Sequence, residues 1–169
     1  MAVAQSVTVS HVQNGSALDY LNDLVRYAYA RLGSFEEAED VAIEVLQDAS
    51  RLRRLDKVKN LQLYLLGMTR RKIADHARRR GPETVPLAQA NDSHSIHENP
   101  EFSLAVRETL RQLPDMYQDV LLLKYVHGLS ADEIAAVLGK SKIAARSLVQ
   151  RSREAFAEIG AHLAEDFRA

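Results

Sequence analysis

The chain has 169 residues, 46% of them hydrophobic, with a formal net charge of −1 and no cysteine. This length and apolar content allow one medium or two small packed domains and exclude a wholly disordered chain. The lack of cysteine excludes a disulfide framework or a thiolate metal site, and it fits a cytoplasmic protein. Residues 1–17 lack the basic and apolar segments of a signal peptide, so we interpret them as a polar tail. No apolar stretch is long enough to span a membrane.

Three helices are predicted in the first half of the chain. Apolar residues recur at a helical period over about 18–32. Ser34, with Glu37 three residues later, has the pattern of a capping box, and the second helix that it begins is predicted to extend to about Leu55. A third helix is predicted over about 61–79, with these residues near its inward stripe: Leu61, Leu65, Met68, Lys72, Ile73 and His76.

A linker and four more helices are predicted in the second half. Residues 81–100 hold three of the four prolines and no Lys or Arg, which is typical of a flexible acidic connection. Helical patterns then cover about 101–112, 115–127, 131–138 and 142–163. The predicted fold class is therefore all-α, with two small helical domains, residues 18–80 and 101–169, joined by that flexible linker.

Charge is sorted by position along the chain. Residues 18–50 carry eight acids and two bases, whereas residues 51–80 carry eleven bases and two acids. Residues 140–153 carry five bases and no acid. Segregation of this kind builds local fields that the net charge of −1 hides. A basic block can follow phosphates while an acidic block faces another partner.

The pattern around Gly139 predicts a helix-turn-helix. A short helix opened by Ser130 and Glu133, a turn of about three residues and a longer helix capped by Ser141 have that layout. Its predicted inward residues are Ile134, Ala135, Leu138, Ala145, Leu148, Ser152, Phe156 and Ile159. Basic and amide side chains on the second helix suit base edges and phosphates of a major groove. The candidate DNA-binding residues are Ser141, Lys142, Arg146, Gln150, Arg151 and Arg153. A plain helical hairpin with a solvated basic face is the alternative.

The run from Leu113 to Phe156 resembles the fourth conserved region of bacterial sigma factors, and most of all that of the extracytoplasmic-function (ECF) group. The matching positions include Leu113, Pro114, Tyr117, Val120, Leu123, Leu129, Ser130, Glu133, Ile134, Ala135, Leu138, Gly139, Ser141, Ser147 and Arg151. The chain departs from the family at Ala144 and Leu148, where Thr and Arg are usual. The resemblance implies that the last helix recognises the minus-thirty-five element of a promoter.

The first half resembles the second conserved region of the same family. The matching positions are Arg26, Tyr27, Ala28, Leu32, Gly33, Ala38, Glu39, Asp40, Val41 and Glu44. In the family this helix docks on the clamp coiled coil of RNA polymerase. An acidic stripe at helical spacing suits such a basic partner, and its candidate polymerase-binding residues are Glu37, Asp40, Glu44 and Asp48. An ordinary solvated helix face is the alternative.

The third helix resembles the family's promoter-melting and minus-ten segment. The loop of residues 56–60 is expected to recognise the minus-ten element, through Lys57, Lys59 and Asn60. Tyr64 stands where the family commonly has Trp. Arg70, Arg71 and Lys72 are expected to hold backbone phosphates, because cationic groups near a melted strand follow its backbone. A basic solvated helix is the alternative.

Together these patterns predict a sigma factor that recognises two promoter elements. The implied partners are the RNA polymerase core (clamp coiled coil and flap), promoter DNA and an anti-sigma factor, which the family commonly has. The sequence shows no catalytic motif, so we expect no enzyme activity and no cofactor. The histidine pair His94 and His97 lacks further ligands, so we expect no metal. Two other hypotheses stay open: a stand-alone helix-turn-helix regulator, and a sigma-like decoy that binds an anti-sigma protein.

Overall fold

The computed structural model describes residues 17–52, 55–80 and 100–166. Helices account for the regular structure of these residues, and no strand occurs among them, which confirms the all-α fold class. The sequence interpretations of the N-terminal tail and of residues 81–99, including His94 and His97, lie outside the described residues. Within the described part, no helix combines the length and the apolar character needed to cross a membrane.

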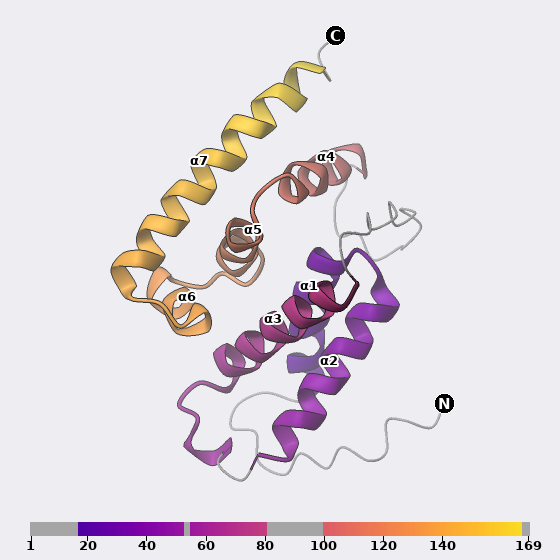
Figure 1. Ribbon diagram of the computed structural model, residues 1–169, viewed down its shortest axis with the longest axis vertical. Coiled ribbons are helices and arrows are strands. Elements are labelled where there is room, and N and C mark those ends of the chain that lie inside the picture. The colour runs from indigo at the N-terminus through magenta and orange to yellow at the C-terminus, as the bar shows by residue number, and fades with distance from the viewer. Residues whose placement is uncertain (1–16, 53–54, 81–99, 167–169) are drawn as a thin grey trace. The chain divides into compact units, whose positions relative to one another are not determined.

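The chain divides into two compact units, residues 1–88 and 89–169, which we call the N-lobe and the C-lobe. The described residues of the N-lobe form three α-helices, each in contact with the other two (Figure 1). Their bounds are α1 Ala17–Leu32, α2 Phe35–Ser50 and α3 Leu61–Arg80, with a 3₁₀ turn, η1, at Leu55–Lys57.

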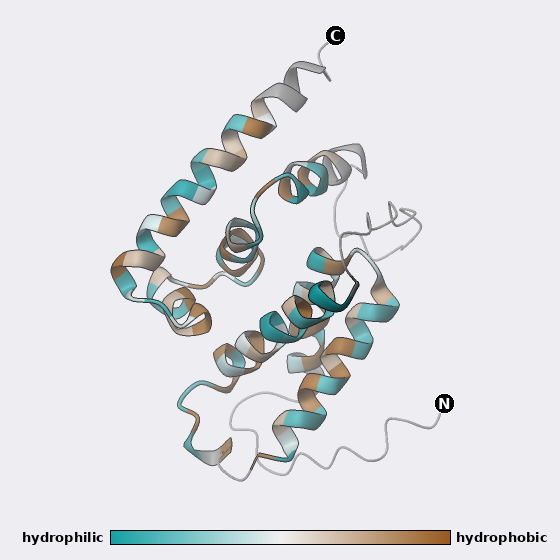
Figure 2. Cartoon of the chain, viewed as in Figure 1, coloured by the Kyte–Doolittle hydropathy of each residue, from teal (hydrophilic) through white to brown (hydrophobic). Residues whose placement is uncertain are grey.

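Apolar faces of all three helices meet in the N-lobe core. Hydrophobic and polar bands alternate along α2, as expected of a helix with one buried side (Figure 2). Among the core residues that are most fully buried are Leu24, Tyr27, Ala28, Ala38, Val45, Leu65 and Leu66. The buried stripe of α3 differs from the predicted one, because it consists of Leu65, Leu66, Thr69 and Ile73. Leu61, Met68, Lys72 and His76 are only half-buried at its edges.

The ends of α2 follow local chemistry. At its start, the Ser34 hydroxyl accepts a hydrogen bond from the Glu37 amide at 3.3 Å, as the cap pattern predicts. The helix ends at Ser50, earlier than the predicted Leu55. Amides of the following residues bond three positions back there, which tightens and stops the last turn. Leu52, beyond this end, is exposed.

The C-lobe is built around its last helix. Its elements are α4 Pro100–Arg111, α5 Asp115–Leu121, the π-helical turn η2 Leu122–Val126, α6 Ala131–Leu138 and α7 Lys142–Asp166. Helices α4, α5 and α6 each pack on α7. Side chains from all of these elements form the core, including Leu110, Val120, Leu123, Ile134, Ala145 and Leu148.

The predicted helix over 115–127 is present but is not α-helical throughout. After Leu121 its hydrogen bonds widen to a π pattern, and the His127 amide donates to the Leu122 carbonyl at 3.2 Å. Gly128 then adopts a positive φ of 67°, and Leu129 turns back into the core, where it is 5% exposed. This turn sets the point at which α6 begins.

Candidate functional sites

The helix-turn-helix frame is rigidly capped. Ser130 and Glu133 form a complete capping box at the start of α6, which confirms that prediction. Gly139 ends α6 in the left-handed region with φ 63°, a conformation that favours glycine. The Ser141 hydroxyl accepts from the Ala144 amide at 3.1 Å and so caps α7. The frame therefore fixes where α7 presents its outer face.

The packing between α6 and α7 largely matches the predicted inward residues. Ile134 and Ala145 are fully buried, and Ala135, Leu148 and Ser152 are also buried. Leu138, Phe156 and Ile159 are half-buried. The two helices contact each other over this surface, so the outer face of α7 is left to solvent.

The predicted DNA-binding residues on α7 are all exposed, but they do not share one face. Lys142, Arg146 and Gln150 follow one another at four-residue spacing, and Arg153 lies on the same side. Arg151 lies about 140° around the helix from Arg146, because each residue advances the helix by about 100°. The structure thus brings four of these side chains together, here called the α7 stripe, and separates Arg151 from them.

One carboxylate connects the first two cations of the α7 stripe. Asp132, in the first turn of α6, binds the Lys142 ammonium at 2.7 Å and the Arg146 guanidinium at 3.4 Å. The hydrogen bond from Lys142 lowers the pKa of Asp132 below its ordinary value. Sequence reasoning missed Asp132, because a pairing between two helices leaves no mark in the periodicity of either one.

Ile143 was also missed. It is 80% exposed at the second position of α7, which is unusual for a large apolar side chain in an otherwise well-packed lobe. The N-terminal residues of such a helix contact base edges, where an apolar group can meet the methyl group of thymine. Its outward position could have been found from the helical spacing to buried Ala145 and Leu148.

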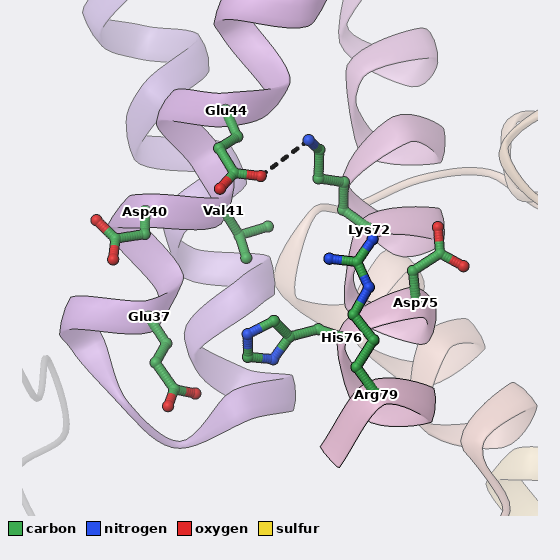
Figure 3. A pocket seen from close by; sticks show the side chains of 8 residues that line it. All are labelled: Glu37, Asp40, Val41, Glu44, Lys72, Asp75, His76 and Arg79. Carbon is green, nitrogen blue, oxygen red and sulfur yellow. Dashed lines mark hydrogen bonds and ion pairs between the residues drawn. The ribbon is translucent and has the colours of Figure 1, made fainter. Parts of the chain in front are cut away.

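The acidic residues of α2 surround a cation from α3. Glu44 and Asp48 each hold the Lys72 ammonium at 2.8 Å, and Figure 3 shows the Glu44 contact. Hydrogen bonds to Asp48 and then to Glu44 raise the pKa of Lys72, and the same bond from Lys72 lowers the pKa of Asp48. Glu44 and Asp48 of the predicted polymerase-binding stripe are therefore engaged within the lobe.

A polar cavity of about 230 Å³ opens between α2 and α3 (Figure 3). Its lining comprises Glu37, Asp40, Val41 and Glu44 from α2 with Lys72, Asp75, His76 and Arg79 from α3. Acids dominate one wall and bases the other. Asp40 and Glu44 are exposed, whereas Glu37 and Asp48 are half-buried. In the described part of the chain, no group of three or more His, Asp and Glu side chains is placed to hold a metal ion.

The predicted minus-ten residues are distributed around the start and the middle of α3. Lys57 and Lys59 are exposed, and Asn60 caps α3 by accepting from the Leu63 amide at 3.1 Å. Tyr64 is half-buried. Arg70, Arg71 and Lys72 are consecutive, so they spread through about 200° of the helix surface and do not form one patch. Only Arg71 of these three is exposed.

Comparison with known proteins assigns both lobes to one class. The family described as sigma-70 region 2 matches residues 17–83, and the family described as sigma-70 region 4 matches residues 103–156. The two regions occur in that order along the chain, as the sequence analysis predicted. The fold and the matched regions therefore define a sigma-70-type protein.

Individual relatives narrow this class to one group. The chain is 32% identical over 155 residues to the ECF RNA polymerase sigma factor SigD of Mycobacterium tuberculosis, covering 81% of this chain and 73% of that protein. It is 28% identical over 158 residues to the ECF sigma factor BldN of Streptomyces coelicolor, covering 86% of this chain. The chain spans 59% of the length of BldN. The chain belongs to the ECF family of RNA polymerase sigma factors.

A solved structure shares the fold. The sigma factor RpoE of Bartonella quintana, crystallised with the anti-sigma factor NepR, has a TM-score of 0.64 and 22% sequence identity. The similarity covers 84% of this chain and 92% of the Bartonella chain. This agreement supports the arrangement of helices described above.

Proposed function

We propose that this chain binds core RNA polymerase and directs it to promoters through the minus-ten and minus-thirty-five elements. The domain of residues 18–80 binds the polymerase clamp and the minus-ten element. The domain of residues 101–169 binds the polymerase flap and the minus-thirty-five element. The phosphodiester chemistry belongs to the polymerase, so the chain is not itself an enzyme. Its place of action is the cytoplasm, where polymerase and promoter lie.

The α7 stripe is the observation that carries this proposal. Lys142, Arg146, Gln150 and Arg153 lie together and exposed on the second helix of a capped helix-turn-helix. Such a helix fits a major groove, where Arg and Lys bind guanine and phosphate and Gln binds adenine. The stripe lies within the segment that matches sigma-70 region 4.

The acidic face of α2 supports polymerase binding by the N-lobe. Glu44 and Asp48 share the Lys72 ammonium, and Asp40 and Glu44 are exposed on the same face of α2. A basic partner is attracted to such a face and is steered to it during encounter. An anti-sigma protein is a further proposed partner, and the Bartonella sigma factor of similar fold was crystallised with one.

Transcription with purified components tests the proposal. The full-length chain is added to core RNA polymerase with pooled genomic fragments of its own organism, and the transcript 5′ ends are sequenced. We expect defined starts that share two upstream elements and that vanish without the chain. A stand-alone regulator would bind fragments without creating starts, and a decoy would do neither. Either result contradicts the proposed function.

A further inference from the structure

The inference concerns Asp132, which faces the α7 stripe from the neighbouring helix. Its two carboxylate oxygens are divided between two cations: Oδ2 accepts from the Lys142 ammonium at 2.7 Å and Oδ1 from the Arg146 guanidinium at 3.4 Å. Lys142 and Arg146 are four residues apart, so they project from one side of α7. One acid thus contacts the two cations that lie nearest the N-terminus of the stripe.

The backbone holds this group in place. The capping box fixes the turn of α6 that carries Asp132, and the Ser141 cap fixes the turn of α7 that carries Lys142. Fully buried Ile134 and Ala145 lock the two helices together beneath them. The backbone positions of the acid and the two bases are therefore set by packed helices and not by loops.

The ion pairs are exposed, and this decides how they act on DNA. The Asp132 side chain is 41% exposed and those of Lys142 and Arg146 are 69% and 67% exposed. Solvent and salt weaken such pairs, so a phosphate or a guanine competes with the acid for either cation. A phosphate that approaches while the Asp132 carboxylate stays paired with these cations is repelled by that carboxylate.

Specific and non-specific DNA complexes differ in the contacts that offset the competition of Asp132 for the two cations. Non-specific binding consists almost wholly of phosphate contacts, which the acid opposes at two cations. In a specific complex, base contacts such as a bidentate Arg–guanine pair add energy that arbitrary sequence does not supply. An exposed acid beside these cations therefore reduces non-specific binding more than specific binding.

We propose that Asp132 is a specificity-determining residue of the α7 stripe: it screens Lys142 and Arg146 from phosphates of arbitrary sequence. The proposal rests on the proposed function, because it requires that α7 contacts duplex DNA. An acid in the first turn of α6 also stabilises the helix through its dipole. The test must therefore separate an effect on DNA recognition from an effect on folding stability.

The experiment measures duplex binding by the full-length protein and by Asp132→Asn, which removes the charge and keeps the shape. Two labelled probes are used: a 30-base-pair duplex of mixed sequence, and a duplex selected from a random pool by the wild-type protein. Fluorescence anisotropy gives both affinities over a series of salt concentrations. Glu158→Gln is the matched control, because it makes the same charge change on α7 about 24 Å from Lys142. Asp132→Glu keeps the charge.

We expect Asp132→Asn to bind the mixed duplex about three- to fivefold more tightly and to steepen its salt dependence by about one released counterion. Its affinity for the selected duplex should stay within about twofold, so the ratio of the two affinities falls. Asp132→Glu and Glu158→Gln should keep the wild-type ratio. A thermal melt checks folding, and a loss of stability alone does not change the salt slope.

Equal changes on both duplexes, or no more change than in Glu158→Gln, would overturn the role of Asp132 while leaving DNA recognition intact. If the wild-type protein selects no sequence and binds neither duplex, the proposed function fails at the C-lobe and the role of Asp132 falls with it. The two failures are therefore distinguishable in one experiment.

Discussion

The two lobes hold their cations in opposite ways. In the N-lobe, the single ammonium of Lys72 lies between two carboxylates, those of Glu44 and Asp48, and Asp48 also pairs with Arg51 at 3.7 Å. In the C-lobe, two cations share the one carboxylate of Asp132, and the cluster is positive. The difference teaches that a basic residue in a basic segment is not always available to a nucleic acid. Lys72 joins α3 to α2, whereas the α7 cations face outward.

Helix geometry strengthens this contrast. The three consecutive bases of α3, residues 70–72, point in different directions around the helix. The α7 bases recur at four-residue spacing and form a stripe. Residues 51–80 have a larger positive balance than residues 140–153, yet the exposed bases Lys142, Arg146 and Arg153 of the smaller block share one side of α7. Spacing, and not the number of charges, therefore decides whether bases share one side of a helix.

The largest expected effect concerns the cores that support the two surfaces. Ile134→Ala in the C-lobe and Leu65→Ala in the N-lobe should each lower the free energy of unfolding of their own lobe by about 2–5 kcal/mol, because each side chain is almost fully buried. Native-state hydrogen exchange with peptide mass spectrometry reports the lobes separately.

Ile143→Ala is the control for this pair, since Ile143 is largely exposed and should change stability by less than about 0.5 kcal/mol. If Ile134→Ala destabilised both lobes equally, the comparison of two separately built surfaces would break down.

The second-largest expected effect compares an arginine of the α7 stripe with an arginine on another side of α7. Arg146→Ala should weaken binding to the selected duplex by about 1–3 kcal/mol if its guanidinium contacts a base. Arg151→Ala removes the same group from the same helix but about 140° away, so it should cost clearly less. Anisotropy titrations at one salt concentration measure both variants. Equal losses would show that the binding surface is not the stripe defined here.

A smaller effect should distinguish Lys72, which pairs with two acids of α2, from its exposed neighbour Arg71. Lys72→Met leaves Glu44 and Asp48 without their shared cation, and we expect a loss of about 0.5–1 kcal/mol in stability with little change in DNA binding. Arg71→Met should do the reverse, lowering the salt dependence of binding to melted promoter DNA by about one counterion. Urea denaturation and salt titrations of both variants with polymerase provide the measurements. A DNA defect in Lys72→Met without a stability defect would contradict this division.

The smallest effect is the pH dependence of the N-lobe cluster. The pKa of Asp48 is lowered, so its contribution to stability is present above about pH 4 and is lost as the pH falls through the lowered folded-state pKa. The pKa of Lys72 is raised, so its contribution is present below about pH 10 and is lost as the pH rises through the raised value.

Wild-type protein should therefore exceed Lys72→Met in stability by a constant amount between these limits, and the difference should shrink outside them by about a few tenths of a kcal/mol. Urea denaturation at acidic, neutral and alkaline pH gives that difference. A constant difference at every pH would assign the effect of the substitution to packing instead of charge.

The sequence predicted the local features of this fold well. Caps at Ser34, Ser130 and Ser141 and the stop at Gly139 involve contacts within four residues, and periodicity indicates a helix from residues close in the chain. The family resemblance correctly placed both regions, because its motifs are likewise local.

Contacts between helices were not predictable in the same way. Nothing in the sequence showed that Lys72 would meet Glu44 and Asp48, or that Asp132 would meet Lys142 and Arg146, because these pairings depend on how two helices pack. The predicted stripe of α3 also failed at Leu66 and Thr69, which are buried only because α1 and α2 cover that side. The DNA and polymerase contacts of the predicted site residues stay predictions.

Because of the π-helical turn over Leu122–Val126, the direction in which the chain enters α6 depends on the number of residues in that turn. A π turn holds about one residue more than an α turn. Deleting one residue there would restore α-helical bonding and rotate everything downstream by about 100° relative to α5. Leu129 would leave its buried position, and α7 would lose its packing on α5 without any change in its own sequence.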